Sequence, residues 1–289
     1  MKATATQMRV CTTITEIRSA LRRAQGSDLR LGFVPTMGAL HEGHLSLVRA
    51  AKAACDAVVV SIFVNPTQFG PREDLAKYPR PFERDCGLLQ KEGVDFLFAP
   101  SAEEMYPQGS VTWVEVEGLS EKLCGRSRPG HFRGVTTVVS KLFHIIQPSA
   151  AFFGQKDAAQ CAIIRRMVRD QNFPVEMVVC PIVREPDGLA MSSRNAYLSP
   201  SERKSALVLY RALSEIQSCF EHSERSAARL IAAGKKVLAE EPGARLDYLE
   251  IVDPESLGSV PVIGGTALVA VAAFVGSTRL IDNILLGTD

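Results

Sequence analysis

One short segment, residues 57 to 64 (AVVVSIFV), restricts the fold more than any other part of the chain. Its side chains are almost all apolar and most are β-branched, which is typical of a strand buried on both faces. Such strands belong to parallel sheets that carry helices on either side. The segment therefore predicts an α/β protein built around a parallel sheet.

Strand and helix patterns alternate as far as residue 183, as the crossover connections of a parallel sheet require. The clearest helix is 135–146, where apolar side chains recur at i, i+3, i+4 and i+7. Other helices are expected at 82–93, around 163–168, and after the first strand, carrying Leu45, Val48 and Cys55. The remaining strands are expected at 31–34, 94–100, 150–154 and 175–183.

The character of the sequence changes at residue 184. Residues 184–199 are polar and contain a Pro-Asp-Gly turn signal. Helices are expected beyond it at 201–221 and 224–240, and strands at 246–252, 266–275 and 279–286. We therefore expect a Rossmann-like doubly wound parallel sheet in residues 1–184 and a smaller α+β C-terminal domain in residues 185–289. The C-terminal domain would act as a lid, with 185–199 as its hinge.

Charge and cysteine usage exclude several classes of protein. The 289 residues include 33 basic and 32 acidic ones, a net charge of +1, so we expect no nucleic-acid partner and no membrane surface. No apolar run is long enough to span a bilayer. Seven cysteines without a Cys-x-x-Cys pair indicate a reduced, cytoplasmic protein. Near the start, Thr13 and Glu16 are spaced as a capping box that opens a helix.

The first polar cluster, PTMGALHEGH at 35–44, directly follows the first expected strand. Its glycines allow close approach of a phosphate, and the following helix offers unpaired N–H groups to an anion. His41 and His44 would lie on the same side of the first helical turn, where they could bind phosphate oxygens. The alternatives are a zinc pair or two surface histidines. The other three histidines form no cluster, so we expect no metal ligands from protein side chains.

Two further polar clusters also follow expected strands. Gln68, in NPTQFG, carries both a donor and an acceptor and could fix a small polar substrate, although an ordinary loop would look similar. In FFGQKDAAQ, Lys156 could contact phosphate and Asp157 the ribose hydroxyls. Asp157 could equally be a helix-start residue and Lys156 a solvated lysine.

A fourth cluster, MSSRN at 191–195, lies in the polar segment after residue 184. Its two hydroxyls and guanidinium suit the oxygens of a triphosphate. A solvated connection is the alternative. The convergence of three strand ends and one loop on the same chemistry favours a phosphate site.

These segments resemble the pantothenate synthetase (pantoate–β-alanine ligase) family of the His-x-Gly-His nucleotidylyl-transferase superfamily. The matching strings are PTMGALHEGH, SIFVNPTQFG with YPR beyond it, RPGHFRGV, FFGQKD and GLAMSSRN, with LDYLEIVDP further on. The first five span residues 35 to 195 in the family's order, which makes the resemblance specific.

The resemblance implies an ATP-dependent ligase. Pantoate would be activated as pantoyl-adenylate with release of pyrophosphate, and β-alanine would then displace AMP to give pantothenate. It also implies Mg²⁺ accompanying ATP, small-molecule substrates only, and a homodimer. The apolar strand that starts at residue 57 could serve that interface or the core.

The resemblance also assigns residues. His44 would be the proton donor and His41 a phosphate contact; the other residues assigned to catalysis are Lys156, Ser192, Ser193 and Arg194. ATP would be bound by Met37, Gly38, Ala39, Leu40, His41, Glu42, Gly43, His44, Gly154, Gln155, Lys156, Asp157, Val183, Met191, Ser192, Ser193 and Arg194. Pantoate would be held by Met37, Gln68 and Gln160, and β-alanine by Gln68.

The matching strings contain one departure from the family, at Gln155, and two arginines without an assigned role. Many members of the family carry Glu where this chain has Gln155, which excludes a carboxylate function there. Arg128 and Arg133 resemble a mobile basic segment beside the site.

Two other functions are compatible with parts of the pattern. A nucleotidylyl transferase acting on a phosphate or nucleotide would share the first cluster, but Gln68 and Gln160 favour a small polar substrate. A nucleotide-binding regulatory module without turnover would not need so many charge-stabilising groups.

Overall fold

The computed structural model describes residues 7–24, 29–71 and 73–287, and its chain forms two compact units. The units are not continuous in sequence. The first comprises residues up to 120 together with 128–154 and 163–180, and the second comprises 121–127, 155–162 and 181–289. The domain boundary expected after residue 184 stays a prediction.

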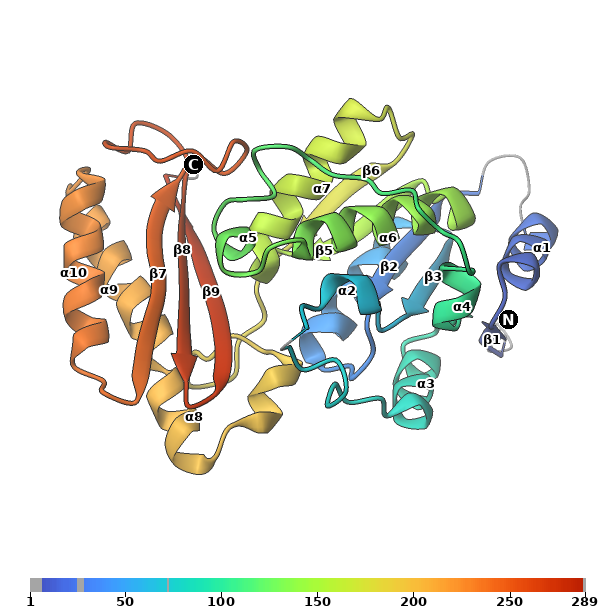
Figure 1. Ribbon diagram of the computed structural model, residues 1–289, viewed down its shortest axis with the longest axis horizontal. Coiled ribbons are helices and arrows are strands. Elements are labelled where there is room, and N and C mark those ends of the chain that lie inside the picture. Colours follow the sequence, from blue (N-terminus) through green and yellow to red (C-terminus); the bar gives the residue numbers. More distant parts are fainter. Residues whose placement is uncertain (1–6, 25–28, 72, 288–289) are drawn as a thin grey trace. The chain divides into compact units, whose positions relative to one another are not determined.

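A parallel sheet of six strands, in the order β1-β4-β3-β2-β5-β6, forms the centre of the first unit (Figure 1). The expected Rossmann-like sheet is confirmed. Its strands are β1 (Arg9–Cys11), β2 (Leu31–Thr36), β3 (Ala57–Ile62), β4 (Phe96–Phe98), β5 (Ala150–Gly154) and β6 (Glu176–Cys180). β3 lies between β2 and β4 and its first five residues are buried, so this strand is core.

Helices cover both faces of this sheet. Consecutive residues of a strand point to opposite faces, so neighbouring residues of β2 contact different helices. On β2, the ring of Phe33 meets that of Phe143 from α6 at a centroid distance of 6.5 Å. Its neighbour Val34 belongs to a buried cluster with Val48 of α2. The helices here are α1 (Ile14–Ala24), α2 (Glu42–Ala54), α3 (Phe82–Lys91), α4 (Ala102–Met105), α6 (His131–Ile146) and the 3₁₀ turn η1 (Pro66–Gln68).

The order of the strands reverses between β2 and β5, which are hydrogen-bonded neighbours at Gly32 and Ala150. Open α/β sheets bind their ligands beyond the carboxyl ends of the strands at such a reversal. The segment carrying His41 and His44 follows β2, and Gln68 follows the adjacent β3. The topology therefore brings the first two polar clusters to one edge of the sheet.

The second unit is built on a three-stranded antiparallel sheet, β7-β8-β9, with α9 and α10 against one face (Figure 1). Buried Leu213, Ile216 and Leu230 on these helices pack with Val269 and Val271 on β8. The strands are β7 (Ala244–Val252), β8 (Ala267–Val275) and β9 (Thr278–Leu286). The helices are α5 (Cys124–Ser127), η2 (Gln155–Asp157), η3 (Ser193–Tyr197), α8 (Pro200–Ala206), α9 (Val208–Glu221) and α10 (Ala227–Ala239). α7 (Ala158–Asp170) begins here and continues in the first unit.

The structure corrects several expected elements. The single helix expected at 201–221 is wrong, because the helix is interrupted at Leu207, which caps both α8 and α9. β1 was not anticipated, and α6 begins four residues earlier than expected. β6 ends at Cys180, since Pro181 has no amide hydrogen for the ladder.

Two other observations concern the described residues. The capping box is confirmed: Glu16 accepts from the N–H of Thr13 at 3.1 Å and donates its own N–H to Thr13 Oγ1 at 3.2 Å. None of the helices described has the length and apolar character needed to cross a membrane.

Candidate active site

A tight turn connects β2 to α2. Thr36 stabilises it by donating from Oγ1 to the backbone oxygen of Ser61 at 2.7 Å and accepting from the N–H of Gly38 at 3.1 Å. Gly38 and Ala39 both adopt left-handed conformations, with φ of 80° and 50°. A Cβ on Gly38 would also lie 3.2 Å from Oδ2 of Asp85. Glycine is therefore the residue that fits this position at no steric cost.

Asp85, a buried carboxylate from α3, supports this turn, and the sequence analysis missed it. Its Oδ1 accepts the N–H of Leu40 at 3.0 Å, and the side chain is only 1% exposed. Burial raises the pKa of Asp85, although hydrogen bonds from the N–H groups of Leu40 and Ala39 oppose the shift. The available signal was a charged residue four positions before buried Leu89, on the apolar face of a helix.

His41 and His44 lie side by side at the start of α2, as their spacing predicted. Their ring centroids are 4.1 Å apart. Nδ1 of His41 accepts the N–H of Gly43 at 3.2 Å, and Nδ1 of His44 accepts the N–H of His41 at 3.3 Å. Because both Nδ1 atoms accept, each neutral ring carries its proton on Nε2. Both rings are thereby oriented as Nε2 donors at the positive end of a helix.

The side chain of Gln68 is held by two neighbours. Its Nε2 donates to Sδ of Met37 at 3.0 Å, and its Oε1 accepts from Nδ2 of Asn65 at 3.1 Å. Asn65 is 1% exposed and also donates to the backbone oxygen of Gly134 at 3.1 Å. The structure therefore brings together Met37 and Gln68, two residues that the sequence assigned to the same substrate.

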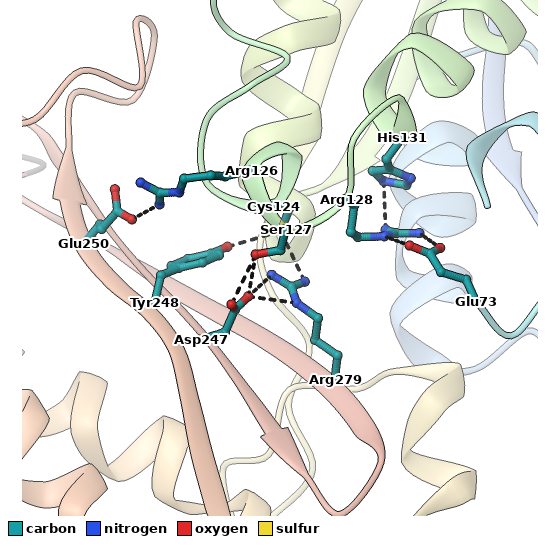
Figure 2. Close-up of polar contacts among 10 residues, drawn as sticks. All are labelled: Glu73, Cys124, Arg126, Ser127, Arg128, His131, Asp247, Tyr248, Glu250 and Arg279. Carbon is teal, nitrogen blue, oxygen red and sulfur yellow. Dashed lines mark hydrogen bonds and ion pairs between the residues drawn. The ribbon is translucent and has the colours of Figure 1, made fainter. Parts of the chain in front are cut away.

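The backbone oxygen of Gln68 is bound by two residues of the RPGHFRGV string. It lies 2.8 Å from Nδ1 of His131 and 3.3 Å from NH2 of Arg128. Arg128 also donates to Nε2 of His131 at 3.0 Å and forms a two-point ion pair with Glu73, at 2.8 and 2.6 Å (Figure 2). Since a guanidinium can only donate, Nε2 of His131 accepts and its Nδ1 carries the proton.

This ion pair affects the ionisation of Glu73. Partial burial disfavours its charged form, but the hydrogen bonds and charge of Arg128 outweigh burial and lower the pKa of Glu73. Arg128 is thus fixed by Glu73, whereas exposed Arg133 stacks over the ring of Trp113 at 4.8 Å.

Gly134 lets α6 approach η1 closely. A Cβ at this position would lie 2.4 Å from the backbone oxygen of Thr67 and 2.8 Å from Cα of Gln68. A side-chain Cβ does not come this close to other heavy atoms, so a larger residue would displace the turn that carries Gln68.

The second unit holds the remaining predicted residues except Gly154. The N–H of Met191 donates to the oxygen of Val183 at 3.0 Å, so these two residues are joined at the base of a small hairpin. Ser192 caps η3 by accepting the N–H of Arg194 at 3.2 Å. Lys156 and Asp157 end η2 directly before α7.

Segment 121–127 is bound to the sheet of the second unit (Figure 2). Sγ of Cys124 lies 3.1 Å from the hydroxyl of Tyr248, and Ser127 donates to Asp247 at 2.9 Å. Arg279 from β9 pairs with the same carboxylate at 2.7 Å. These contacts fix the residues that directly precede Arg128 in the chain.

The predicted residues are therefore divided between the units. Met37 to His44, Gln68 and Gly154 belong to the first, and Gln155, Lys156, Asp157, Gln160, Val183 and Met191 to Arg194 belong to the second. Among the described residues, no three His, Cys, Asp or Glu side chains are grouped so that they could hold a metal ion.

Comparison with known proteins gives a consistent result. The family model described as pantoate-beta-alanine ligase matches residues 9–285. A protein named pantothenate synthetase from Koribacter versatilis (strain Ellin345) is 63% identical over 279 residues, which cover 96% of each chain.

Solved structures agree with this. The crystal structure of pantothenate synthetase from Thermus thermophilus superposes with a TM-score of 0.92 at 51% identity, covering 96% of this chain and 99% of that one. That of a pantoate-beta-alanine ligase from Francisella tularensis, described as complexed with beta-gamma ATP and beta-alanine, superposes with a TM-score of 0.80 at 35% identity, covering 96% and 97%.

Proposed function

This chain belongs to the pantoate-beta-alanine ligase family, and from that membership we propose how its residues perform the family's reaction. The chain is an enzyme that condenses pantoate with β-alanine at the expense of ATP. One observation supports the assignment of roles: functional side chains follow β2 and β3 at the same edge of the sheet. The oriented rings of His41 and His44 follow β2, and the hydrogen-bonded amide of Gln68 follows β3.

A carboxylate does not react with an amine, so pantoate must first be activated. A carboxylate oxygen of pantoate attacks the α-phosphorus of ATP, the bond from that phosphorus to the bridging oxygen breaks, and pyrophosphate leaves. The β-alanine amine then attacks the carbonyl carbon of the adenylate. The carbon–oxygen bond to AMP breaks and the amine loses a proton, which yields pantothenate.

The histidines act on the phosphates. Negative charge grows on the departing pyrophosphate, and Nε2–H donors at a helix N-terminus stabilise such charge. We assign His44 as the proton donor and His41 as a phosphate contact. The hydrogen bonds to their Nδ1 atoms support this, because they fix the tautomer in which Nε2 donates.

Gln68 holds pantoate together with Met37 and Gln160, and it also contacts β-alanine. Sulfur is a weak acceptor, so the bond from Gln68 to Met37 orients the amide without competing strongly with a substrate oxygen. Asn65 and His131 fix the other atoms of Gln68. The activated carbon belongs to pantoate and is attacked by β-alanine. The two substrates therefore lie next to each other, and one rigid amide can contact both.

The nucleotide is bound by the turn after β2 and by segments of the second unit. Backbone atoms of Met37 to Leu40 and of Gly154 and Gln155 approach the nucleotide, with Glu42 and Gly43 at the start of α2. Lys156, Ser192, Ser193 and Arg194 neutralise the phosphates, and Asp157 accepts from the ribose. Val183 and Met191, joined by one hydrogen bond, line the same nucleotide site.

ATP enters as its Mg²⁺ complex. Mg²⁺ keeps several waters and is commonly carried by substrate phosphates with little help from protein side chains. Residues 185–289 form the lid domain, with 185–199 as its hinge, which would exclude water from the adenylate.

The enzyme is a cytoplasmic homodimer. Its seven free thiols are consistent with a reducing compartment. β3 is core, so we assign the dimer contact to exposed apolar side chains of the first unit, Val111 and Trp113, which are 82% and 44% exposed. Sedimentation equilibrium at micromolar concentration should give twice the chain mass, and Val111→Lys should reduce it to one.

Isotope exchange between pyrophosphate and ATP tests the two-step reaction. With Mg²⁺ and no amine present, exchange should require pantoate, because adenylate formation is reversible. Addition of β-alanine should then release AMP. Exchange without pantoate would indicate another acceptor, and ATP binding without any exchange would indicate a non-catalytic nucleotide module.

A further inference from the structure

Two consecutive polar residues are buried on β9, one of the two edge strands of the sheet in the second unit. Asp282 is 4% exposed and Asn283 is 2% exposed. The strand around them is mainly apolar, and a polar side chain in such a place is costly unless its hydrogen bonds are made. Each of the two residues makes them with a different distant segment of the chain.

Asn283 binds the turn that carries Lys156. Its Nδ2 donates to the backbone oxygens of Gln155 at 3.0 Å and Lys156 at 2.9 Å. Its Oδ1 accepts from Nε2 of Gln155 at 3.0 Å. Both Nδ2 hydrogens and the carbonyl oxygen of one amide are therefore used on η2. The contact also gives Gln155 a role that needs an amide donor and no carboxylate.

Asp282 binds the hairpin between Val183 and Met191. Its carboxylate accepts two hydrogen bonds from Arg184, at 2.6 and 2.9 Å. The same guanidinium donates to the backbone oxygen of Gly188 at 3.0 Å and lies over the ring of Tyr210 at 4.6 Å. Arg184 is thereby fixed at three points, and it directly follows Val183 in the chain.

The charges of Arg184 and Lys156, one from each segment, both act on Asp282. Burial raises the pKa of Asp282, while the hydrogen bonds and charge of Arg184, and the charge of Lys156, act in the opposite direction. The charge of Lys156 thus favours the ionised form of the carboxylate that holds Arg184. The direct contacts place Arg184 and the turn of Lys156 before any anion is bound.

We propose that Asp282 and Asn283 are positioning residues for the nucleotide: Asn283 fixes the turn that presents Lys156, and Asp282, through Arg184, fixes the hairpin of Val183 and Met191. The inference rests on the nucleotide-binding roles proposed above for those segments. Neither residue touches substrate. They set the geometry of two ATP-binding segments that lie far apart in sequence, from one strand of the C-terminal sheet.

The test compares Asn283→Leu with the parent enzyme. Leu has a similar volume but leaves the oxygens of Gln155 and Lys156 without their donor. The Kd for Mg²⁺–ATP, measured by titration calorimetry, should rise about tenfold or more, because small displacements of charged groups are costly. The KM for β-alanine, which is assigned to Gln68 in the first unit, should stay within about twofold. Leu230→Ala, a buried change in α10 away from both segments, serves as the control for general destabilisation.

Arg184→Lys tests the role of Asp282, which acts through Arg184, and preserves the positive charge opposite Asp282. Lys cannot make the two-point contact and also reach Gly188, so ATP binding should weaken several-fold while the thermal midpoint changes little. This variant decides the matter if Asn283→Leu does not fold.

The outcomes separate this inference from the assigned reaction. A parent enzyme that binds ATP but shows no pantoate-dependent exchange would contradict the reaction, while the Kd values would still test the positioning role. Normal exchange in the parent together with an unchanged ATP Kd in both variants would overturn the inference. So would equal effects of Asn283→Leu and Leu230→Ala on the Kd for ATP and the KM for β-alanine.

Discussion

The ring of His131 donates from Nδ1 to the backbone oxygen of Gln68 across 2.8 Å. His131 thus fixes the main chain of a residue whose amide we assign to both pantoate and β-alanine. Arg128 fixes the tautomer of the ring by donating to Nε2. A histidine that the sequence showed only as part of a matching string therefore has a defined structural task.

Replacement of His131 by Ala should raise the KM for pantoate and β-alanine about tenfold, because Gln68 loses its shortest backbone hydrogen bond. The KM for ATP should rise less. Steady-state kinetics with each substrate varied in turn measures this. His222→Ala is the matched control, since Nδ1 of that exposed histidine bonds to the backbone oxygen of Ser218, one helical turn away, at 2.8 Å. Equal changes for all three substrates would show a general loss of structure instead.

Substitution of Gly134 by Ala should destabilise the protein by about 1–3 kcal/mol and impair pantoate binding, since the new Cβ would overlap Thr67. Gly87 provides the contrast, because a Cβ there meets no described atom within 4 Å. Gly87→Ala, within α3, should stabilise by about 0.5–1 kcal/mol. Urea unfolding of both variants checks the pair, and similar values would mean that α6 yields to the added methyl group.

Glu73→Gln should lower stability at pH 7 by about 1–2 kcal/mol, because Arg128 loses a charged partner within a half-buried pair. The pKa of Glu73 is lowered in the folded state, so its contribution is fully present above the ordinary value of 4.5. It is lost as the pH falls through the lowered value. Denaturant unfolding between pH 7 and pH 3 should therefore show the two proteins converging in acid. A difference that persists unchanged at low pH would contradict the ion pair as its source.

Asp85→Ala should cost about 1–3 kcal/mol, because the N–H of Leu40 would lose its acceptor. Asp85→Asn keeps that acceptor and removes a buried charge. The pKa of Asp85 is raised in the folded state. Its carboxyl group therefore stabilises the folded parent below the ordinary pKa of 3.8, and this stabilisation is lost as the pH rises through the raised value. At pH 7 the Asn variant should thus be at least as stable as the parent. A loss equal to that of the Ala variant would show that the carboxylate charge itself is required.

His44→Ala should reduce the rate of adenylation more than it raises the KM for ATP, since a proton donor acts on the transition state. Pyrophosphate exchange at saturating ATP measures the rate. Because His44 also accepts the N–H of His41, the thermal midpoint of the variant must be compared with that of the parent. A raised KM with an unchanged rate would make His44 a binding residue only.

Local patterns predicted the elements that carry the site. The spacing of His41 and His44 placed both rings on one helical turn, and the apolar run at β3 identified a strand in the middle of the sheet. These features depend on residues close in sequence. The break at Leu207 was missed because apolar periodicity continues through it.

Supporting contacts could not be predicted in the same way. Asp85 and Leu40 are 45 residues apart, and His131 and Gln68 are 63 apart. Such pairs are formed by the packing of complete elements. The helical pattern could mark Asp85 as a buried charge, but no local pattern identifies Leu40 as its partner. The sequence identified the residues assigned to substrates but not the residues that hold them.

The place of β9 in the chain affects how the protein is made. Asn283 follows its partner Lys156 by 127 residues, and Asp282 follows Arg184 by 98. Synthesis proceeds from the N-terminus, so both segments that we assign to the nucleotide leave the ribosome long before the strand that fixes them. A growing chain can complete its parallel sheet while those segments still lack their buried partners. Firm binding of ATP would thus appear only after β9 has been made, which makes nucleotide affinity a sensitive indicator that the three-stranded sheet is complete.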